Sequence, residues 1–496
     1  GLDRFKAREA TLQKLEELGV LVKTEEYDKT MDKHDRCSTE IEPYLSDQWY
    51  VKMEPLAKKA IDIVEKDKKI RFVPERYTDL YLNWLKNIKD WCISRQLWWG
   101  HQIPVWYKKD SEDFIVSEMP PNDIENYVQD EDVLDTWFSS ALWPFVTLGW
   151  PDKTPHFETF YPTSVLATAR EIINLWVSRM IYMGLEFAGD IPYTDVLIHP
   201  VIQTPDGKRM SKSKGNAIDP LEMIEKYGAD ANRFWYFSLG VKGNQDVRFS
   251  GNKNKEGKWE SDVLEQNKRF ANKLWNAVRF VVQNLEPGKK FKTSLEDVDL
   301  EKLTIADRWI LHRYTNLVSS LKKDFDEYEF SLVTDSLYKF TWDQFCDWYI
   351  EIAKRQMQDE NLKEQTQKVL VYIIQGIVRA LHPIMPFITD EIWQTLPLDG
   401  IDDVKSLIDI SYPEPDKKYL NEETDKRFSH VIETTRTIRN LRQTLNIPWT
   451  QEIDSKLFTQ NDFERDALQD SSHYISSLTK SKVSIESDYK PIKPST

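Results

Sequence analysis

The densest group of side chains able to do chemistry lies in a cationic loop, residues 208–214. Its seven residues carry four cations and two hydroxyls. Ammonium, guanidinium and hydroxyl groups suit a polyphosphate, because they can follow negative charge as it moves onto a leaving pyrophosphate. A loop of this kind can also close when substrate binds. Charge runs are usually solvated faces, so composition alone favours a plain basic turn.

The residues around the cationic loop predict how the chain holds it. Pro205-Asp206-Gly207 follows an apolar run and predicts a turn, since proline presets φ and glycine supplies a positive φ. Asp219-Pro220 predicts a helix start with an N-cap, and Gly228 predicts its end. We therefore expect the cationic loop to lie between a strand and a capped helix.

Alternating apolar segments surround this region. Strands are expected at 164–167 and 195–202, with a helix over about 169–186 between them. Strand, helix, strand, helix is typical of an α/β fold with a doubly wound parallel sheet. Beyond about residue 250 helical spacing dominates and predicts an all-α bundle. The expected helices are 258–285, 302–325, 330–357, 363–382, 384–397 and, after a Pro-rich linker, 421–446.

Composition narrows the class of protein. Hydrophobic residues make up 40% of the 496, which predicts packed domains, and no apolar run is long enough to cross a membrane. The net charge of −15 argues against a surface coated with phosphate-binding groups, although local basic patches can still bind nucleic acid. Three well-separated cysteines indicate a reducing cytoplasm. His34 and Cys37 have no second pair nearby, so no zinc site is predicted.

Arg209-Met210-Ser211-Lys212-Ser213 resembles the Lys-Met-Ser-Lys-Ser signature of class I aminoacyl-tRNA synthetases. The matching register extends from His199-Pro200 through Gly215-Asn216 and Asp219-Pro220 to Tyr227-Gly228-Ala229-Asp230-Ala231. The resemblance implies that Lys212, Arg209, Ser211 and Ser213 form a catalytic loop acting on ATP with Mg²⁺. Arg209 stands where the family usually has lysine; the charge is kept, but a planar fork replaces a compact ammonium.

Three further segments resemble the valyl-tRNA synthetases: 41–53, 90–101 and 132–144. The resemblance covers nearly the whole chain and implies a valine–tRNA ligase, which activates valine with ATP and transfers it to tRNA(Val). Two alternatives stay open. The chain could be a non-catalytic tRNA-binding module derived from a class I synthetase, or an isoleucyl-type enzyme.

The resemblance places the valine side chain against Trp137, Ile172 and Trp176. Ile172 and Trp176 are four residues apart, so they share one face of a helix. Two indoles and a branched aliphatic side chain would make a small rigid apolar cup. Plain core packing is the alternative. A cup of this kind rejects an isosteric threonine poorly, and the family carries a separate editing domain.

The ATP-binding residues implied by the resemblance are Glu171, His199 and Lys212. Glu171 matches an acid that takes the ribose hydroxyls, and His199 matches a position near the adenosine. Ala169 replaces a glycine that the family has before this acid. Thr168 and Glu171 would equally suit a capping box, which is a purely structural role.

The helical part resembles the anticodon-binding bundle of the family. Arg436, Arg439 and Arg442 are spaced by three along one predicted helix and are expected to contact tRNA, where guanidiniums take phosphates or stack on bases. A solvated helix face is the alternative.

The resemblance also implies a domain order. Residues 1–40 would be the trailing edge of an editing domain, and 41–250 the C-terminal part of a Rossmann-type catalytic domain with a connective insertion and the cationic loop. Residues 251–300 would be stem-contact helices, 301–415 the bundle, and 416–496 a C-terminal helix and tail. No His-Ile-Gly-His-type motif occurs, so we expect a C-terminal portion that is inactive alone. The expected partners are tRNA(Val), valine and ATP, with no membrane, for a cytoplasmic monomer.

Overall fold

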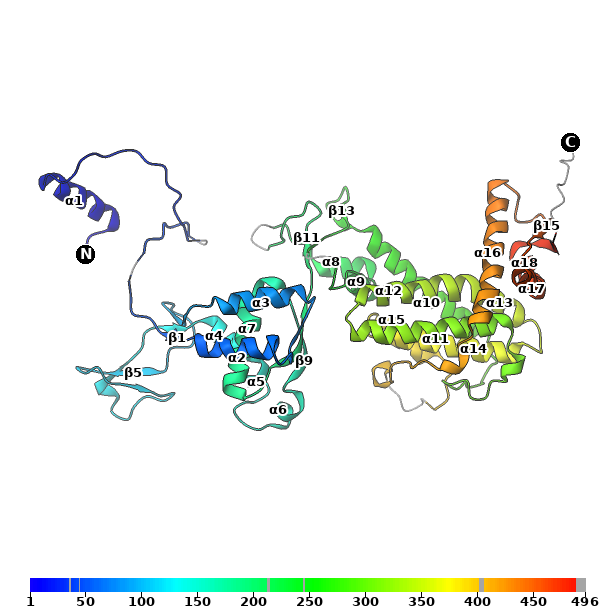
Figure 1. Cartoon of the computed structure of the whole chain (residues 1–496), viewed down its shortest axis with the longest axis horizontal. Coiled ribbons are helices and arrows are strands. Elements are labelled where there is room, and N and C mark those ends of the chain that lie inside the picture. The colour runs from blue at the N-terminus through cyan, green and yellow to red at the C-terminus, as the bar shows by residue number, and fades with distance from the viewer. Residues whose placement is uncertain (35–36, 44, 212–214, 244–245, 401–405, 488–496) are drawn as a thin grey trace. The chain divides into compact units, whose positions relative to one another are not determined.

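The computed structural model describes residues 1–34, 37–43, 45–211, 215–243, 246–400 and 406–487 (Figure 1). The chain forms two compact units, Gly1–Lys52 with Asp90–Asp135 and Met53–Lys89 with Thr136–Thr496. The segment 41–250, which the sequence assigns to one domain, contributes to both units. None of the helices in the described ranges has the length and apolar character needed to span a bilayer.

The first unit combines one helix with short antiparallel strands. Helix α1 (Arg4–Glu17) is capped by Asp3, whose carboxylate accepts a hydrogen bond from the backbone N–H of Phe5, and none of its residues is buried. The strands pair as β1 (Tyr50–Val51) with β3 (Trp91–Cys92), β4 (Ser94–Arg95) with β8 (Val133–Leu134), and β5 (Val105–Lys108) between β6 (Phe114–Val116) and β7 (Tyr127–Gln129), which follows the 3₁₀ turn η1 (Ile124–Asn126). The buried carboxylate of Asp135 accepts hydrogen bonds from Trp91 Nε1 at 3.0 Å and Arg95 Nη2 at 2.9 Å.

A parallel sheet organises the start of the second unit and confirms the predicted α/β fold. Its order is β2 (Arg71–Val73), β10 (Tyr193–Ile198), β9 (Thr163–Thr168), and both pairings are parallel. The helices of this part are α2 (Glu54–Glu65), α3 (Arg76–Lys86), α4 (Thr136–Ala141), α5 (Trp143–Val146) and α6 (Pro155–Phe160).

The chain between β9 and β10 is helical, as predicted, but its helix changes type. A 3₁₀ turn, η2 (Arg170–Ile172), leads into a π-helix, η3 (Ile173–Val177), then α7 (Ser178–Met183) and a second π-helix, η4 (Gly184–Ala188). The predicted strand 195–202 is two strands. Because proline cannot donate a ladder hydrogen bond, the strand breaks at His199-Pro200, and β11 (Val201–Gln203) pairs instead with β12 (Asp246–Arg248).

The helices predicted beyond residue 250 are present in the described ranges. They follow α8 (Pro220–Tyr227), α9 (Ala229–Ser238) and a small hairpin of β13 (Asn252–Lys253) and β14 (Trp259–Glu260). The bundle elements are α10 (Asp262–Gln283), η6 (Leu300–Lys302), α11 (Ile305–Asp326), α12 (Phe330–Lys339), the π-helix η7 (Phe340–Tyr349), α13 (Ile350–Gln356), α14 (Lys363–Leu381), α15 (Pro386–Thr395), η8 (Leu407–Asp409), η9 (Lys417–Tyr419) and α16 (Glu422–Thr444).

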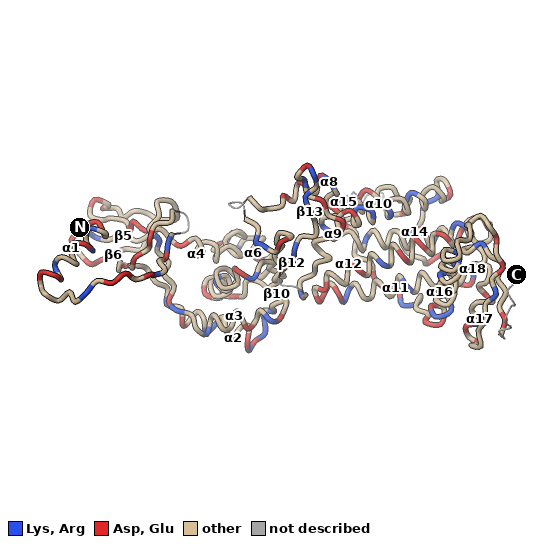
Figure 2. Tube along the Cα trace, turned by 90° about the horizontal axis from the view of Figure 1, so that it is seen from above, with Lys and Arg blue, Asp and Glu red and all other residues tan. Residues whose placement is uncertain are grey.

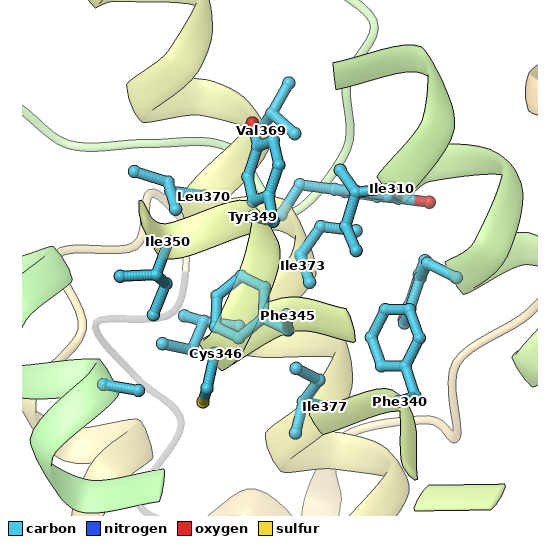
Figure 3. Close-up of a cluster of buried hydrophobic side chains, with 14 of the residues drawn as sticks. Ile310, Phe340, Phe345, Cys346, Tyr349, Ile350, Val369, Leu370, Ile373 and Ile377 are labelled. Carbon is cyan, nitrogen blue, oxygen red and sulfur yellow. The ribbon is translucent and has the colours of Figure 1, made fainter. Parts of the chain in front are cut away.

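The bundle core is apolar and closely packed. Figure 3 shows Phe345 of η7 beside Ile373 and Ile377 of α14, and all three side chains are fully buried. Glycine is required at one position, since a Cβ on Gly376 would lie 1.9 Å from the hydroxyl oxygen of buried Tyr314. Helices α11 and α14 therefore approach more closely here than any side chain would allow.

After α16 the chain forms a small α/β unit that the sequence analysis missed. Strand β15 (Ile453–Phe458), helices α17 (Asp462–Asp470) and α18 (Ser472–Thr479), and strand β16 (Ser481–Glu486) follow in order, and the strands pair in parallel. The sequence analysis assigns 416–496 to a C-terminal helix and tail, whereas the structure has two strands and two helices over 453–486. Both strands are short, and their weak alternation of apolar and polar residues is a faint strand signal.

Arg442 fastens α16 to this small unit. Its side chain is 2% exposed, and its guanidinium donates to the carbonyl oxygens of Pro448 and Gln451 at 2.7 Å and of Thr479 at 3.3 Å. The Nη atoms of Arg442 are thus bound to carbonyl oxygens inside the protein, and its contact with tRNA stays a prediction.

Two polar joints connect the α/β part to the bundle within the second unit. In the first, the carboxylate of Asp230 accepts the backbone N–H groups of Phe387 and Ile388 at 3.2 and 2.7 Å, at the start of α15. Arg233 donates to the carbonyl oxygens of Pro383 and Ile384, each at 2.9 Å. Helix α9 is thereby anchored to the turn between α14 and α15.

The second joint is centred on Asp195 in β10. Arg71 of β2 donates two hydrogen bonds to its carboxylate at 2.9 and 3.0 Å, and Tyr328, between α11 and α12, donates its hydroxyl at 2.7 Å. Burial by itself raises the pKa of Asp195, but the hydrogen bonds from Arg71 and Tyr328 outweigh it and lower the pKa.

Asp195→Asn should lower the free energy of unfolding by about 1 kcal/mol at neutral pH, because the charged acceptor is lost. Since the pKa of Asp195 is lowered in the folded state, its contribution is present above the unfolded value of about 3.9 and disappears as the pH falls through the folded value. Urea denaturation at neutral and at acidic pH would measure both effects. Asp152→Asn removes the same charge from an exposed turn and is the matched control. Equal denaturation midpoints for Asp195→Asn and wild type at neutral pH would contradict this role.

Candidate functional site

The carboxyl ends of β9 and β10 lie side by side. Thr168 and Ile198 are register partners, and the N–H of the next residue, His199, donates to the carbonyl oxygen of Thr168 at 3.1 Å. Ligands of open parallel sheets bind at this edge, outside the carboxyl ends of the strands. Glu171 and His199, singled out from the sequence, both follow these strand ends.

The backbone before Glu171 is relaxed. Ala169 has φ −86° and ψ 156°, an extended conformation that any residue adopts, so alanine fits where the family has glycine. No side chain caps the following 3₁₀ turn, so the capping box of Thr168 and Glu171 is not formed. Glu171 is half-buried with a carboxylate oxygen 3.9 Å from Arg170, and His199 is exposed with Nδ1 3.0 Å from the carbonyl oxygen of Pro200.

A network that the sequence analysis missed joins this edge to β12. The guanidinium of Arg170 donates to both carboxylate oxygens of Asp246 at 2.9 and 3.1 Å, and Gln203 Nε2 donates to the same carboxylate at 2.8 Å. The hydrogen bonds with Asp246 raise the pKa of Arg170. The planar fork of arginine suits this bidentate contact, which fixes direction as well as charge. The partners are 76 positions apart, and no spacing in the sequence indicates that they meet.

The turn before the cationic loop is built around Thr204, whose hydroxyl contacts Asp206 and accepts the N–H of Lys208. Gly207 has φ +80°, as the turn prediction required. Lys208 lies 2.7 Å from Asp206, and hydrogen bonds from Lys208 and then Thr204 lower the pKa of Asp206 to about 2. One cation of the loop is thus paired within the turn.

The described ends of the cationic loop are tied together by Asn216. Its side-chain carbonyl accepts the N–H of Ser211 at 2.9 Å, and its amide donates to the carbonyl oxygen of Arg209 at 3.1 Å. Arg209 also forms a backbone bridge with Gln203, and its side chain is exposed. Lys212 and Ser213 lie outside the described residues.

Apolar and capping contacts hold the residues that flank the loop. Met210 packs against a cluster that contains Met223, Trp235 and Phe249. After the loop, α8 begins at Asp219, whose carboxylate accepts the N–H of Leu221 at 2.9 Å, as the sequence predicted. The described residues on both sides of the loop are therefore held in place.

These contacts form one continuous path. Glu171 adjoins Arg170, which binds Asp246; Asp246 binds Gln203, and Gln203 pairs with Arg209. The path links the strand-end carboxylate to the base of the cationic loop. A ligand with hydroxyls at one end and phosphates at the other matches this order of acceptor and donor groups.

The predicted apolar cup is carried by neighbouring elements. Helix α4, which contains Trp137, packs against η3, which contains Trp176, and Trp176 Nε1 donates to the carbonyl oxygen of Ser140 at 2.9 Å. Ile172 ends a 3₁₀ turn while Trp176 lies in a π-helix, so the expected α-helical relation between them is replaced by a wider turn. The sequence analysis did not single out Trp143, whose ring centroid lies 5.9 Å from that of Trp176.

Arg436 and Arg439 share one aromatic neighbour. Their guanidinium carbons lie 5.5 and 5.2 Å from the ring centroid of Trp348. Arg439 also donates to the carbonyl oxygen of Leu478 at 3.1 and 3.0 Å, and burial lowers its pKa. Of the three predicted RNA contacts, Arg436 is the exposed one.

Metal ligands do not gather in the described part of the chain: no group of three or more His, Cys, Asp or Glu residues there could hold an ion. His34 Nδ1 and Cys37 Sγ lie 3.3 Å apart in the first unit. Hydrogen bonding with Thr39 is the main cause that lowers the pKa of exposed Cys37 to about 7.

Two family descriptions match successive parts of the chain. Residues 9–250 match the family described as tRNA synthetases class I (I, L, M and V), and residues 307–457 match the anticodon-binding domain of tRNA ligase. A valine–tRNA ligase of Staphylococcus carnosus is 43% identical over 96% of this chain and 52% of its own length. The corresponding protein of Geobacillus stearothermophilus is 45% identical, with the same coverage. The chain thus spans about half the length of the curated relatives it matches.

Solved structures share the fold at low identity. A Mycobacterium tuberculosis methionyl-tRNA synthetase in complex with methionyl-adenylate has a TM-score of 0.54 at 16% identity, covering 73% of this chain and 65% of its own. An Agrobacterium radiobacter LeuRS–tRNA–LeuAMS ternary complex has a TM-score of 0.53 at 17% identity, covering 68% and 43%.

Asn216→Ala should loosen the cationic loop without unfolding the protein, because it removes both side-chain hydrogen bonds that tie residue 216 to the backbone of Arg209 and Ser211. Limited trypsin digestion should cut after Arg209 several-fold faster, while the thermal midpoint changes little. Asn254→Ala is the matched control, since Asn254 accepts two backbone N–H groups in a separate turn. If both variants are cleaved after Arg209 at the wild-type rate, Asn216 does not restrain the loop.

Proposed function

Because the chain belongs to the class I tRNA synthetase family, we propose that it functions as a valine–tRNA ligase. In the first step the carboxylate of valine attacks the α-phosphorus of ATP, the bond to the β-phosphate oxygen breaks, and valyl-adenylate and pyrophosphate form. In the second, a ribose hydroxyl of tRNA(Val) attacks the activated carbonyl, loses its proton and displaces AMP.

The observation that carries this proposal is the path from Glu171 to Arg209. Glu171 would accept hydrogen bonds from the ribose hydroxyls of ATP, and His199, from the next strand end, would lie against the adenosine. Arg170 and Asp246 would hold the strand end and the loop base at a fixed separation. One nucleotide could then contact both.

The cationic loop would stabilise the pyrophosphate. Lys212, with Arg209, Ser211 and Ser213, would meet the negative charge as it develops, and the substrate would be ATP with Mg²⁺ bound to its phosphates. Asn216 binds the backbone of Arg209 and Ser211, so the described residues on the two sides of the loop are fixed to each other.

Lys212→Ala should reduce valine-dependent ATP–pyrophosphate exchange by about 2–4 kcal/mol of transition-state stabilisation, measured in a protein extended to the length of the relatives. Lys208→Ala is the matched control and should cost much less, because Lys208 is paired with Asp206. An exchange rate in Lys212→Ala equal to that of wild type would refute the role of the loop.

Valine would sit against Trp137, Ile172 and Trp176, with Trp176 oriented by its hydrogen bond to Ser140. Ile172→Ala should raise KM for valine about tenfold or more and leave KM for ATP unchanged, because part of an apolar pocket is lost. Leu175→Ala is the control, since Leu175 is exposed on the same segment. An equal rise in both KM values would indicate a general distortion instead of a valine pocket.

The same assays separate the two alternatives. Exchange that depends on isoleucine would identify an isoleucyl enzyme, and the absence of exchange with retained tRNA binding would identify a non-catalytic module. The relatives named above favour valine. We further propose that the bundle binds tRNA(Val) through Arg436 and Arg439, and that the protein acts as a cytoplasmic monomer.

A further inference from the structure

A groove of about 760 Å³ runs between α16 and β15, both labelled in Figure 1, and we call it the β15 groove. Residues 430–445, in and directly after α16, line it on one side, and residues 453–459 line it on the other. Its volume lies within the range of roughly 300–1,000 Å³ that ligand clefts have. The groove shares no residue with the strand-end site.

The β15 groove lies along one edge of its strand. Every residue from 453 to 459 lines it, and none of the described residues of β16 does. Because successive side chains of a strand point to opposite faces, a groove that touches all of them lies at the edge of the strand. Since β16 pairs with the other edge, this edge has no partner strand within the described ranges.

Backbone groups on this edge are available for hydrogen bonds. The N–H of Ile453 donates to the carbonyl oxygen of Lys480 at 3.4 Å, so Ile453 directs its backbone toward β16. The direction alternates along a strand, so the N–H and C=O groups of Asp454 and Lys456 point the other way, toward the edge that lines the groove. An unpaired row of this kind is a template for a further strand.

The side of α16 that lines the groove is apolar. Ile438, Leu441 and Leu445 follow one another at intervals of three and four residues, which places them on one face. Ile438 is buried, whereas Leu441 and Leu445 are 54% and 65% exposed. An occupant of the groove would therefore cover apolar surface as well as bind the edge of β15.

Carboxylates dominate the charge that an occupant meets. Glu433 and Asp454 line the groove, both are exposed, and neither has an ion-pair partner in the part of the chain that the structure describes. Lys456 lies 3.6 Å from Glu486. Arg442 is 2% exposed, with its Nη atoms bound to carbonyl oxygens. The groove consequently attracts a basic occupant.

The polar edge, the apolar side and the negative charge together favour one kind of occupant. A small apolar molecule would cover the leucines but leave the backbone groups of β15 unpaired. A basic helix would satisfy its own backbone groups and offer none to β15. An extended strand offers both, because its backbone binds the edge while alternate side chains point to α16 and to solvent.

We propose that the β15 groove binds one extended strand of a second polypeptide, in which apolar and basic residues alternate. The strand forms hydrogen bonds with the backbone of Asp454 and Lys456. Its apolar side chains cover the two exposed leucines, and a basic side chain pairs with the carboxylate of Asp454. This protein-binding surface goes beyond the proposed synthetase chemistry and does not depend on it.

Fluorescence anisotropy of the full chain with labelled synthetic peptides tests the proposal. The probe is a short peptide that alternates valine and lysine, and the comparison peptides replace lysine by glutamate or place all valines before all lysines. The alternating basic peptide should bind about tenfold tighter than either, since it alone presents apolar side chains on one face and cations on the other. Hydrogen exchange should slow at the amides of Asp454 and Lys456 when it binds.

Lys456→Pro should abolish binding of the alternating basic peptide, because it removes the N–H on the open edge and leaves the ladder between β15 and β16 in place. Lys456→Ala is the matched control, since it keeps that N–H, and it should bind as wild type does. Leu441→Ser should weaken binding several-fold, while Leu332→Ser, at a similarly exposed leucine outside the groove, should not. Asp454→Asn should weaken binding and reduce its dependence on salt.

Equal affinity for the three peptides, or binding that neither Lys456→Pro nor Leu441→Ser changes, would overturn the proposal. Sedimentation velocity of the chain alone adds one further outcome. A dimer that Lys456→Pro dissociates would show that a second copy covers this edge, and it would overturn the proposal as well. If the thermal midpoint shows that Lys456→Pro does not fold, Leu441→Ser and Asp454→Asn decide the result.

Discussion

The bidentate contact between Arg170 and Asp246 is the interaction on which the strand-end site depends. It joins the end of β9 to the start of β12, two strands that belong to different sheets. Each partner is about three-quarters covered, so water competes weakly for the hydrogen bonds. Gln203 binds the same carboxylate and carries the connection to the base of the cationic loop. One carboxylate thus holds both the strand end that carries Glu171 and the base of the loop.

The sequence correctly predicted those features that a few neighbouring residues determine, such as turns and helix caps. The turn at Gly207 and the cap at Asp219 were predicted because φ and a single side-chain hydrogen bond decide them. The parallel sheet and the bundle helices were predicted from apolar periodicity, which burial imposes on any core. Contacts between residues far apart in the sequence could not be predicted. The partners of Arg170 and of Arg442 lie in segments that nothing in the sequence marks as neighbours.

The spacing of apolar residues also could not predict where the helix changes from α to π. A π-helical segment has no distinctive amino-acid composition, so the sequences of η3 and η7 resemble those of ordinary amphipathic helices. Both nonetheless carry residues of the candidate sites, Trp176 in η3 and Trp348 in η7. Figure 2 shows cations and anions interspersed along the bundle helices, in keeping with a net charge of −15.

Arg442 has a practical meaning for anyone who divides this protein into pieces. Its guanidinium is buried, and its Nη atoms donate to carbonyl oxygens that follow α16, at Pro448, Gln451, Thr479 and Lys480. A shortened bundle ending at Thr444 would lose these acceptors and would expose the face of α16 that packs against α17 and α18. The smallest separable bundle fragment thus extends through β16, to Glu486.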